Sequence, residues 1–428
     1  MKNSEKTVAV IGLGYVGLPL AVRAKERGYR VIGFDTNDEK IALINDGKSP
    51  IFEEFLDERI EKYHPEATSD PQKIQEADIV LICVPTPVDA LHNPDYGPVE
   101  SATRIVAQNL KKGALVVLES TVNPGVSEEI VAPIFEQAGQ VLGSDVYLAH
   151  CPERINPGDK KWNVTNIPRV IGALDATGLA IGLEFYQSIV DAPIRPMKAI
   201  REAEAVKILE NSFRNVNIAF VNELARSFAE LGIDIKDVIE GAATKPFAFM
   251  AHYPSCGIGG HCIPVDPYYL VEYAKKTSGF DHKFLSLALE INRNMPAYTV
   301  DLLQDALNEV KLPMNGTRVG VLGLAYKANI DDMRESPALD VIKHLNEHHC
   351  VVETFDPYVL KDSTQKTLDG ILGACDALIL TANHTAFVDM LTPELLNKHG
   401  IRVIVDGKNC LDKALFKEAS IVYKGIGR

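Results

Sequence analysis

A cysteine in the middle of the chain lies in a setting that suits covalent chemistry. Cys262 follows the glycine-rich stretch 257–260 and is flanked closely by two prolines. Glycines and prolines of this kind predict a rigid, exposed loop that presents the sulfur to a substrate carbon. Asp266, four residues further on, would hold a water or a proton nearby. We therefore predict Cys262 as a nucleophile, although free cysteines are usually buried and inert, as we expect of the other six.

Polar side chains recur at helical spacing about fifty residues earlier. Steps of four, four and seven place four of them on one face of a predicted helix: Lys207, Asn211, Asn215 and Asn222. Asparagine is a poor helix former, so three of them within one helix require a reason. One reason is a polar stripe that faces a site, in which Lys207 and Asn211 stabilise an alkoxide or oxyanion. A solvated helix face is the equally weighted alternative.

A glycine fingerprint near the N-terminus predicts a dinucleotide site. The stretch 12–17 reads Gly-Leu-Gly-Tyr-Val-Gly, follows a predicted strand and opens a predicted helix. Gly12 permits the tight turn, Gly14 lets the backbone approach a pyrophosphate, and Gly17 allows close helix–strand packing. Asp35 ends the next strand, where a carboxylate binds a ribose 2′-hydroxyl, and the following Thr-Asn offers no cation for a 2′-phosphate. We therefore expect NAD rather than NADP; the alternative is a glycine-rich turn without a ligand.

Further polar residues follow two other predicted strands, at the sheet edge where open parallel sheets bind ligands. Thr121 ends a Glu-Ser-Thr run after one strand, and Glu153 and Arg154 follow Pro152 after another. Glu153, fixed by the proline, would act as a general base for water, and an ordinary surface carboxylate is the competing interpretation. Histidines and a cysteine at 344–350 lack a second ligand pair at defined spacing, so zinc is not favoured there and we expect no metal.

Parallel sheets must position these residues, and the hydrophobic pattern predicts two of them. Short β-branched runs alternate with helical stretches in the first two hundred residues and again after a linker at 312–316, which indicates βαβ units. Between them, one helical pattern without Pro or Gly spans 201–231. The predicted strands occupy 8–11, 31–34, 79–83, 115–118, 146–149, 170–171, 319–322, 351–355, 377–380 and 403–405.

The two ends of the chain resemble each other, because 8–15 aligns with 319–326 and each copy is followed by Phe-Asp. We therefore expect an α/β fold in which two Rossmann-like parallel-sheet domains are joined by a central helical domain with a long helix. The expected domains are 1–200, 201–310 and 311–428.

The second copy has lost part of its fingerprint. Ala325 and Ala328 replace two of the glycines, so the backbone cannot cradle a pyrophosphate as closely. Lys327 and Arg334 would meet phosphate charge with side chains instead. A second nucleotide in a different pose fits this copy better than a second NAD, and a sheet kept for structure alone is the alternative.

The composition excludes several classes of protein. The 428 residues are 46% hydrophobic and 24% charged, which rules out wholesale disorder. The formal net charge of −14 makes nucleic acid and anionic membranes unexpected partners. The apolar N-terminal run is broken by glycines and a proline, so we expect neither a secretion signal nor a membrane span. Seven scattered cysteines describe no disulfide framework, and we expect a cytoplasmic protein.

Taken in order, these motifs resemble those of the UDP-sugar 6-dehydrogenases, also called nucleotide-sugar dehydrogenases, over essentially the whole chain. The resemblance is carried by the fingerprint together with 119–121, 151–154, Lys207 with Asn211, 259–266, 326–327 and 334–337. It implies oxidation of the C6 alcohol of a UDP-sugar to a carboxylate with two NAD. It also implies a homodimer or higher homo-oligomer that buries the long helix.

The resemblance also assigns roles to residues. Cys262 would add to the C6 aldehyde as a thiohemiacetal that becomes a thioester, and Glu153 with Thr121 would place the water that hydrolyses it. The lysine and asparagine of the long helix would stabilise oxyanions, while Asp266 assists with proton and water placement. The implied cofactor contacts are Gly12, Gly14, Tyr15, Val16, Gly17, Asp35, Thr86, Thr121 and Arg334. The implied substrate contacts are Glu153, Arg154, Lys207, Asn211, Arg214, Gly259, Tyr326 and Lys327.

Two features are similar to the branch that acts on N-acetylated hexosamines. His261 stands before the cysteine, where the UDP-glucose branch commonly has a small residue, and the long helix carries the pattern 210–214 with 217–219. We favour UDP-N-acetylglucosamine, with the N-acetylmannosamine and N-acetylgalactosamine forms and UDP-glucose as alternatives. Two other classes are a single-step 3-hydroxyacid-type dehydrogenase, which has no need of Cys262, and a non-catalytic nucleotide-binding protein.

Overall fold

The computed structural model describes residues 3–51, 54–89, 93–155 and 161–428, and it divides the chain into two compact units. The first unit comprises Met1–Glu210 and Tyr268–Ser278, and the second comprises Asn211–Pro267 and Gly279–Arg428. Among the described helices, not one combines the length and the hydropathy needed to cross a bilayer.

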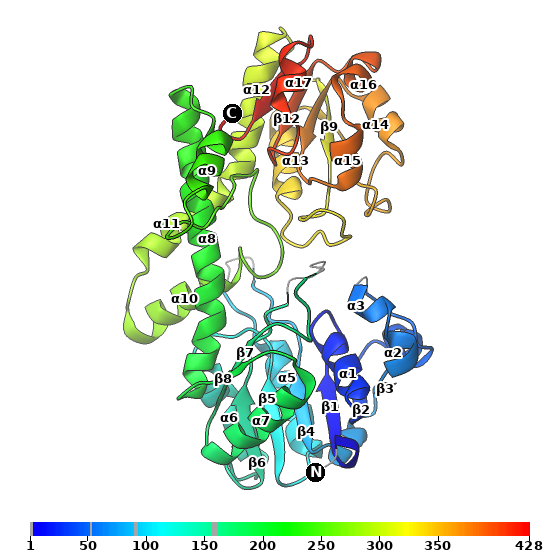
Figure 1. Cartoon of the computed structure of the whole chain (residues 1–428), viewed down its shortest axis with the longest axis vertical. Helices are drawn as coiled ribbons and strands as arrows, with labels where there is room; N and C mark the ends of the chain where they lie inside the picture. The colour runs from blue at the N-terminus through cyan, green and yellow to red at the C-terminus, as the bar shows by residue number, and fades with distance from the viewer. Residues whose placement is uncertain (1–2, 52–53, 90–92, 156–160) are drawn as a thin grey trace. The chain divides into compact units, whose positions relative to one another are not determined.

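The first unit is built on an eight-stranded sheet of order β3-β2-β1-β4-β5-β6-β7-β8 (Figure 1). Its strands are β1 (Thr7–Ile11), β2 (Arg30–Phe34), β3 (Glu66–Thr68), β4 (Ile79–Ile82), β5 (Ala114–Leu118), β6 (Val146–His150), β7 (Arg169–Ala173) and β8 (Ile194–Pro196). Neighbouring strands are parallel except for the antiparallel pair β6 and β7. The strand order reverses between β1 and β4, and such a switch point is where open α/β sheets bind ligands, beyond the carboxyl ends of their strands.

Helices cover both faces of this sheet because consecutive strand residues point to opposite sides. Val8 and Val10 belong to the core formed with α1 and α7, whereas Ala9 and Ile11 belong to the core formed with α5 and α6. The helical elements are η1 (Asn3–Glu5), α1 (Gly17–Glu26), α2 (Asp38–Asn45), α3 (Glu54–Asp57), α4 (Ile60–Tyr63), η2 (Pro71–Glu76), α5 (Gly97–Asn109), η3 (Ser127–Val131), α6 (Ala132–Gln137) and α7 (Ala176–Ile189).

The second unit contains a five-stranded, all-parallel sheet of order β10-β9-β11-β12-β13. Its strands are β9 (Arg318–Leu322), β10 (Val351–Phe355), β11 (Ala377–Leu380), β12 (Val403–Asp406) and β13 (Val422–Gly425). One face packs against α12 and α13, and the other packs against α14 to α17. The helices are α9 (Ile235–Ala243), α11 (Lys283–Arg293), α12 (Met295–Glu309), α13 (Pro337–Glu347), α14 (Leu368–Ala374), α15 (Thr385–Met390), α16 (Pro393–Lys398) and α17 (Lys413–Lys417).

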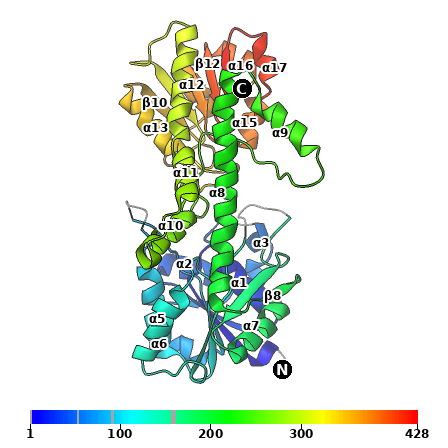
Figure 2. The ribbon, with the colours of Figure 1, turned by 90° about the vertical axis from the view of Figure 1, so that its left-hand side faces the viewer.

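Two helices contribute residues to both units. The 31-residue helix α8 (Ile200–Glu230) is continuous, as Figure 2 shows, and α10 (Asp266–Ser278) begins at the predicted catalytic aspartate. The predicted α/β class, with parallel sheets and a long central helix, is confirmed. The short strands β3, β8 and β13 were not predicted, because Glu-Ala-Thr, Ile-Arg-Pro and Val-Tyr-Lys-Gly contain no continuous β-branched run. The division at 1–200, 201–310 and 311–428 stays a prediction.

Candidate active site

The glycine turn after β1 has the geometry that a dinucleotide needs. Gly12 has φ +91°, and a Cβ there would lie 2.8 Å from the carbonyl oxygen of Cys83. A Cβ on Gly17 would lie 1.9 Å from the Gly12 carbonyl oxygen, so α1 can approach the turn only through glycine. A Cβ on Gly14 would meet nothing within 4 Å, which leaves the backbone open where a diphosphate would approach. These residues fit NAD, and Tyr15 and Val16 lie in the same turn.

Asp35 lies beside the turn with an unexpected partner. Its carboxylate accepts from the Leu13 N–H at 2.9 Å, the Asn37 N–H at 3.0 Å and Lys40 Nζ at 3.0 Å. Burial acts to raise the pKa of Asp35, but these bonds lower it below its ordinary value. The sequence motif predicted no cation at this position, and Lys40 was not among the predicted site residues. The signal was available, since Asn37 caps α2 and places Lys40 in its first turn.

The remaining predicted cofactor residues of this unit lie after β4 and β5, near the switch point. Thr86 is buried, and its carbonyl oxygen accepts from the Tyr269 hydroxyl. Thr121 follows Ser120, whose hydroxyl donates to the Val84 carbonyl at 2.7 Å. The loops after β4 and β5 are therefore tied together at the carboxyl edge of the sheet.

A buried arginine joins two carboxylates at the same edge. Arg169 donates to both oxygens of Glu119 at 3.0 and 3.3 Å, and to Glu153 Oε2 at 2.7 Å. The Tyr186 hydroxyl also donates to Glu119, and the Arg169 guanidinium lies 5.6 Å from the centre of the Tyr186 ring. Burial raises the pKa of Glu119 to about 7, against the attraction of Arg169 and with the help of Glu153. Arg169 was not predicted from the sequence, although a cation at the start of a buried strand was a usable signal.

Glu153 is 6% exposed and is not a surface carboxylate. Besides the bond from Arg169, its Oε1 accepts from the backbone N–H groups of Arg154 and Ile155. The Arg154 guanidinium pairs with Glu210 on α8 and donates to the Pro168 carbonyl at 2.8 Å. The structure thus brings Glu153, Arg154 and Glu210 together in the first unit, where Lys207 is half-buried one turn before Glu210 on α8.

The environments of the seven cysteines, two in the first unit and five in the second, set Cys262 apart from the other six. All seven are free thiols, and only Cys262 and Cys410 are partly exposed. Burial raises the pKa of the thiols of Cys83, Cys151, Cys256, Cys350, Cys375 and Cys410. Since the thiolate is the nucleophile, these six environments oppose reaction.

The Cys262 loop joins directly to the predicted acid and amide. The Asp266 N–H donates to the Cys262 carbonyl at 2.8 Å, and Asn211 Nδ2 donates to Asp266 Oδ2 at 2.5 Å. Asp266 is fully buried. The structure therefore brings Cys262 and Asp266 together with Asn211, which lies 55 positions before Asp266 in the sequence. Arg214, the other predicted residue of α8 in this unit, is exposed.

A chain of buried amides holds the Cys262 loop from both sides. The Ser255 N–H donates to Asn222 Oδ1 at 3.0 Å, and Asn222 Nδ2 donates to Asn292 Oδ1 at 2.9 Å. Asn292 Nδ2 then donates to Asn215 Oδ1 at 3.1 Å, and Asn215 Nδ2 donates to the Ile263 carbonyl at 3.0 Å. The asparagine stripe of α8 is therefore buried against a loop and is not a solvated face. Asn292, on α11, gave no signal in the sequence.

The glycines before Cys262 are required by a second loop. A Cβ on Gly259 would lie 2.5 Å from Tyr326 Cβ, and a Cβ on Gly260, at φ +88°, would lie 2.8 Å from the Tyr326 ring. The Gly260 N–H donates to the Arg334 carbonyl at 3.0 Å. The guanidinium of Arg334 makes a bidentate contact with the Asp332 carboxylate. The hydrogen bonds to Asp332, together with the attraction between Arg334 and Cys262, raise the pKa of Arg334. Gly259, Tyr326, Lys327 and Arg334 thus belong to two loops in contact.

His261 directly precedes Cys262, the predicted nucleophile, in the same loop. Its Nε2 is buried with no hydrogen-bond partner among the described residues. Burial, helped by the charge of Arg334, lowers the pKa of His261, so the imidazole beside Cys262 is uncharged at neutral pH.

Comparison with known proteins agrees with these features. Sequence models of the UDP-glucose/GDP-mannose dehydrogenase family match its NAD binding domain at residues 6–190, its central domain at 201–294 and its UDP binding domain at 320–413. The chain is 34% identical over 425 residues to a UDP-N-acetyl-D-mannosamine dehydrogenase of Pyrococcus horikoshii, covering 98% of this chain and 99% of that protein. It is 37% identical over 395 residues to a UDP-N-acetyl-D-glucosamine 6-dehydrogenase of Salmonella typhi, covering 90% and 92%. The solved structure of the UDP-D-ManNAc dehydrogenase from Pyrococcus horikoshii has a TM-score of 0.92 at 34% identity and covers 99% of both chains.

The Asp35 carboxylate provides a test of the ribose site. Asp35→Ala should weaken NAD binding about tenfold or more, because a charge-assisted hydrogen bond is worth roughly 1.5–3 kcal/mol. The change also frees Lys40, so the ratio of NADP to NAD affinity should rise. Calorimetric titration with each dinucleotide measures both effects, with the exposed Asp38→Ala as control. Unchanged affinities would remove Asp35 from the ribose contact.

The raised pKa of Glu119 makes stability depend on pH. Between the ordinary value of 4.5 and the folded value of about 7, the folded protein binds a proton that the unfolded chain has lost. The contribution of Glu119 to the free energy of unfolding should therefore fall by about 3 kcal/mol as the pH rises through this window. Urea titrations at pH 4.5 to 7.5 should show a flatter profile for Glu119→Gln than for wild type or the exposed-residue control Glu136→Gln. Parallel profiles for all three proteins would contradict the assignment.

Proposed function

The chain belongs to the UDP-glucose/GDP-mannose dehydrogenase family, and from this premise we propose that it oxidises the C6 hydroxymethyl group of a UDP-N-acetylhexosamine to the uronate through a cysteine thioester. It is an NAD-dependent nucleotide-sugar dehydrogenase. The observation that carries the proposal is Cys262, a partly exposed thiol on a loop fixed by α8, while burial raises the pKa of each of the other six thiols.

Bound NAD supplies the chemistry of accepting a hydride in each of the two oxidations. Cys262 Sγ adds to the C6 aldehyde and forms a thiohemiacetal, whose oxidation leaves a thioester. Water then adds to the thioester carbon and releases the thiol, so water provides the second oxygen of the carboxylate. Lys207 and Asn211 stabilise the oxyanions in these steps, and Asp266 holds Asn211 in its orientation.

Glu153, with Thr121, is the proposed acceptor for the hydrolytic water. A carboxylate has about four lone-pair sites, and the bonds from Arg169, Arg154 and Ile155 use three of them. The remaining site, on Oε2, suits one water molecule. Arg169 fixes the direction of that site, so Glu153 can orient the water as well as accept its proton.

Among the N-acetylhexosamines, we propose UDP-N-acetylglucosamine first and UDP-N-acetylmannosamine second. The two relatives described above are named for different epimers, one for N-acetylmannosamine and one for N-acetylglucosamine. Tyr326, Lys327 and Arg214 are proposed contacts of the UDP-sugar, and Arg334 of the cofactor. A cytoplasmic location is part of the proposal and suits the seven free thiols.

A homodimer is also part of the proposal. Phe213 and Phe220 on α8 are 51% and 56% exposed in the single chain, and Phe284 on α11 is 71% exposed. Large aromatic side chains in this number mark a surface that another protein covers. A second copy of the chain would remove them from water.

Reaction stoichiometry and the thiol provide the test of function. With UDP-N-acetylglucosamine or UDP-N-acetylmannosamine, wild type should form two NADH per sugar, whereas a single-step dehydrogenase would form one. Cys262→Ser should lower uronate formation at least a hundredfold, because a serine hydroxyl is a far weaker nucleophile and leaving group, with NAD affinity unchanged. Cys410→Ser, at the other partly exposed thiol, is the control and should retain activity. Normal uronate formation by Cys262→Ser would refute the mechanism.

The aromatic surface predicts the oligomeric state. Phe213→Asp combined with Phe220→Asp should convert a dimer to a monomer in light scattering after gel filtration, because burying two carboxylates is costly. Leu415→Asp changes a similarly exposed side chain on α17 and should leave the dimer intact. A dimer that survives the double change would place the interface elsewhere.

A further inference from the structure

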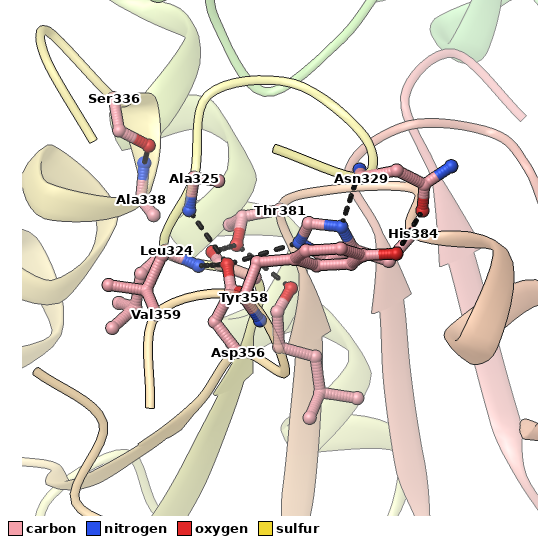
Figure 3. A network of polar contacts seen from close by, with 12 residues as sticks. Leu324, Ala325, Asn329, Ser336, Ala338, Asp356, Tyr358, Val359, Thr381 and His384 are labelled. Carbon is pink, nitrogen blue, oxygen red and sulfur yellow. Dashed lines mark hydrogen bonds and ion pairs between the residues drawn. The ribbon is translucent and has the colours of Figure 1, made fainter. Parts of the chain in front are cut away.

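A buried carboxylate–imidazole pair lies at the carboxyl ends of β9, β10 and β11 in the second sheet (Figure 3). Asp356 directly follows β10, and its Oδ2 accepts from the N–H groups of Leu324 and Ala325 at 2.7 and 2.8 Å. His384 Nε2 lies 3.0 Å from the same oxygen, and the Tyr358 N–H donates to Oδ1 at 2.8 Å. Asp356 and His384 are both fully buried.

Asp356 stands where Asp35 stands in the first sheet, but its oxygens are used differently. Asp35 accepts three hydrogen bonds, and so keeps about one of four lone-pair sites for a ribose hydroxyl. Asp356 accepts four, three on Oδ2 and one on Oδ1, and it is fully buried, whereas Asp35 is 8% exposed. Burial acts to raise the pKa of Asp356, but the bonds from His384 and the backbone lower it, so the group stays a carboxylate. The second sheet therefore presents no exposed carboxylate oxygen at this position to a dinucleotide ribose.

His384 connects Asp356 to the loop after β9. Its Nδ1 accepts from the Asn329 N–H at 2.8 Å, which makes Nε2 the protonated nitrogen that donates to Asp356. The Tyr358 ring stacks on the imidazole with centroids 5.0 Å apart. The neutral ring thus contacts the loop after β9 directly through Nδ1, and through Nε2 it contacts Asp356, which accepts from Leu324 and Ala325 of the same loop.

Asn329 is anchored a second time through its side chain. It has φ +60°, and its Oδ1 accepts from the Thr385 N–H at 3.1 Å and the Tyr358 hydroxyl at 3.3 Å. Its Nδ2 donates to Thr385 Oγ1 at 3.0 Å. A non-glycine residue in the left-handed region is held there by these contacts.

The two anchor points enclose the residues proposed to contact the UDP-sugar. Tyr326 and Lys327 lie between Ala325 and Asn329, and the glycines before Cys262 pack on Tyr326. The position of this short segment therefore depends on the pair Asp356–His384 at one end and on Asn329 at the other.

We propose that Asp356, His384 and Asn329 are positioning residues. At the sheet edge where a dinucleotide would bind, they instead fix the segment 326–327, which contacts the UDP-sugar. They exclude a second NAD, and they fix Tyr326 and Lys327 for the uridine diphosphate of the substrate. This inference rests on the proposed function.

Two substitutions of His384 distinguish the hydrogen bond made by Nδ1 from the one made by Nε2. His384→Asn places an amide oxygen where Nδ1 lies and keeps the bond from Asn329, whereas His384→Gln places an amide nitrogen near Nε2 and loses that bond. We expect KM for the UDP-sugar to rise at least tenfold in His384→Gln and less than threefold in His384→Asn, with kcat and KM for NAD within twofold of wild type. His348→Gln, at an exposed histidine, is the matched control. Equal KM values for the UDP-sugar in all variants, or equal losses in kcat and in KM for NAD, would overturn the proposal.

A second variant and a binding measurement guard against loss of folding. Asn329→Gly suits the left-handed backbone, leaves the buried pair intact and removes only the side-chain contacts. Calorimetric titration should show weaker binding of UDP to this variant, and one NAD bound per chain to both it and wild type. Unchanged UDP affinity, or two NAD per wild-type chain, would contradict the proposal. If wild type binds UDP but oxidises no UDP-sugar, the proposed function fails while the UDP result still decides the positioning role.

Discussion

The Cys262 loop depends on one polar constraint, a chain of three buried asparagine amides that runs from the Ser255 N–H to the Ile263 carbonyl. Each amide donates in one direction and accepts from the other, so the chain has a single consistent polarity. Breaking any link would leave a buried amide without a partner, which costs about 1–3 kcal/mol. The loop is therefore held at two points eight residues apart, with the thiol between them.

At the carboxyl edge of each sheet, one buried side chain forms hydrogen bonds with two polar partners. In the first unit, Arg169 satisfies Glu119 and Glu153 together, and so keeps two buried carboxylates in fixed orientations. In the second unit, His384 donates to the Asp356 carboxylate and accepts from the Asn329 N–H in the loop after β9. Buried polar groups are tolerated only when paired, and each pair here fixes a loop that carries a candidate site residue.

Much of the fold and part of the site could be predicted from sequence. The strands with continuous β-branched runs, the glycine turn and the long helix followed from local pattern alone, because periodicity and backbone freedom are local properties. Lys40 and Arg169 each left a usable local signal, a capped helix start and a cation at the start of a buried strand, whereas Asn292 left none, because its partner Asn215 lies 77 positions away in the sequence. The asparagine stripe was recognised, but only the structure shows that it faces the Cys262 loop.

The account rests on a single reactive thiol, and the order in which the seven cysteines react with iodoacetamide tests it most directly. Native protein would be sampled over time, with peptide mass spectrometry for each thiol and NADH formation for activity. We expect Cys262 to be alkylated first and activity to fall in the same proportion, because burial raises the pKa of the other six thiols. Activity that survives complete alkylation of Cys262, or that disappears before Cys262 reacts, would contradict the account.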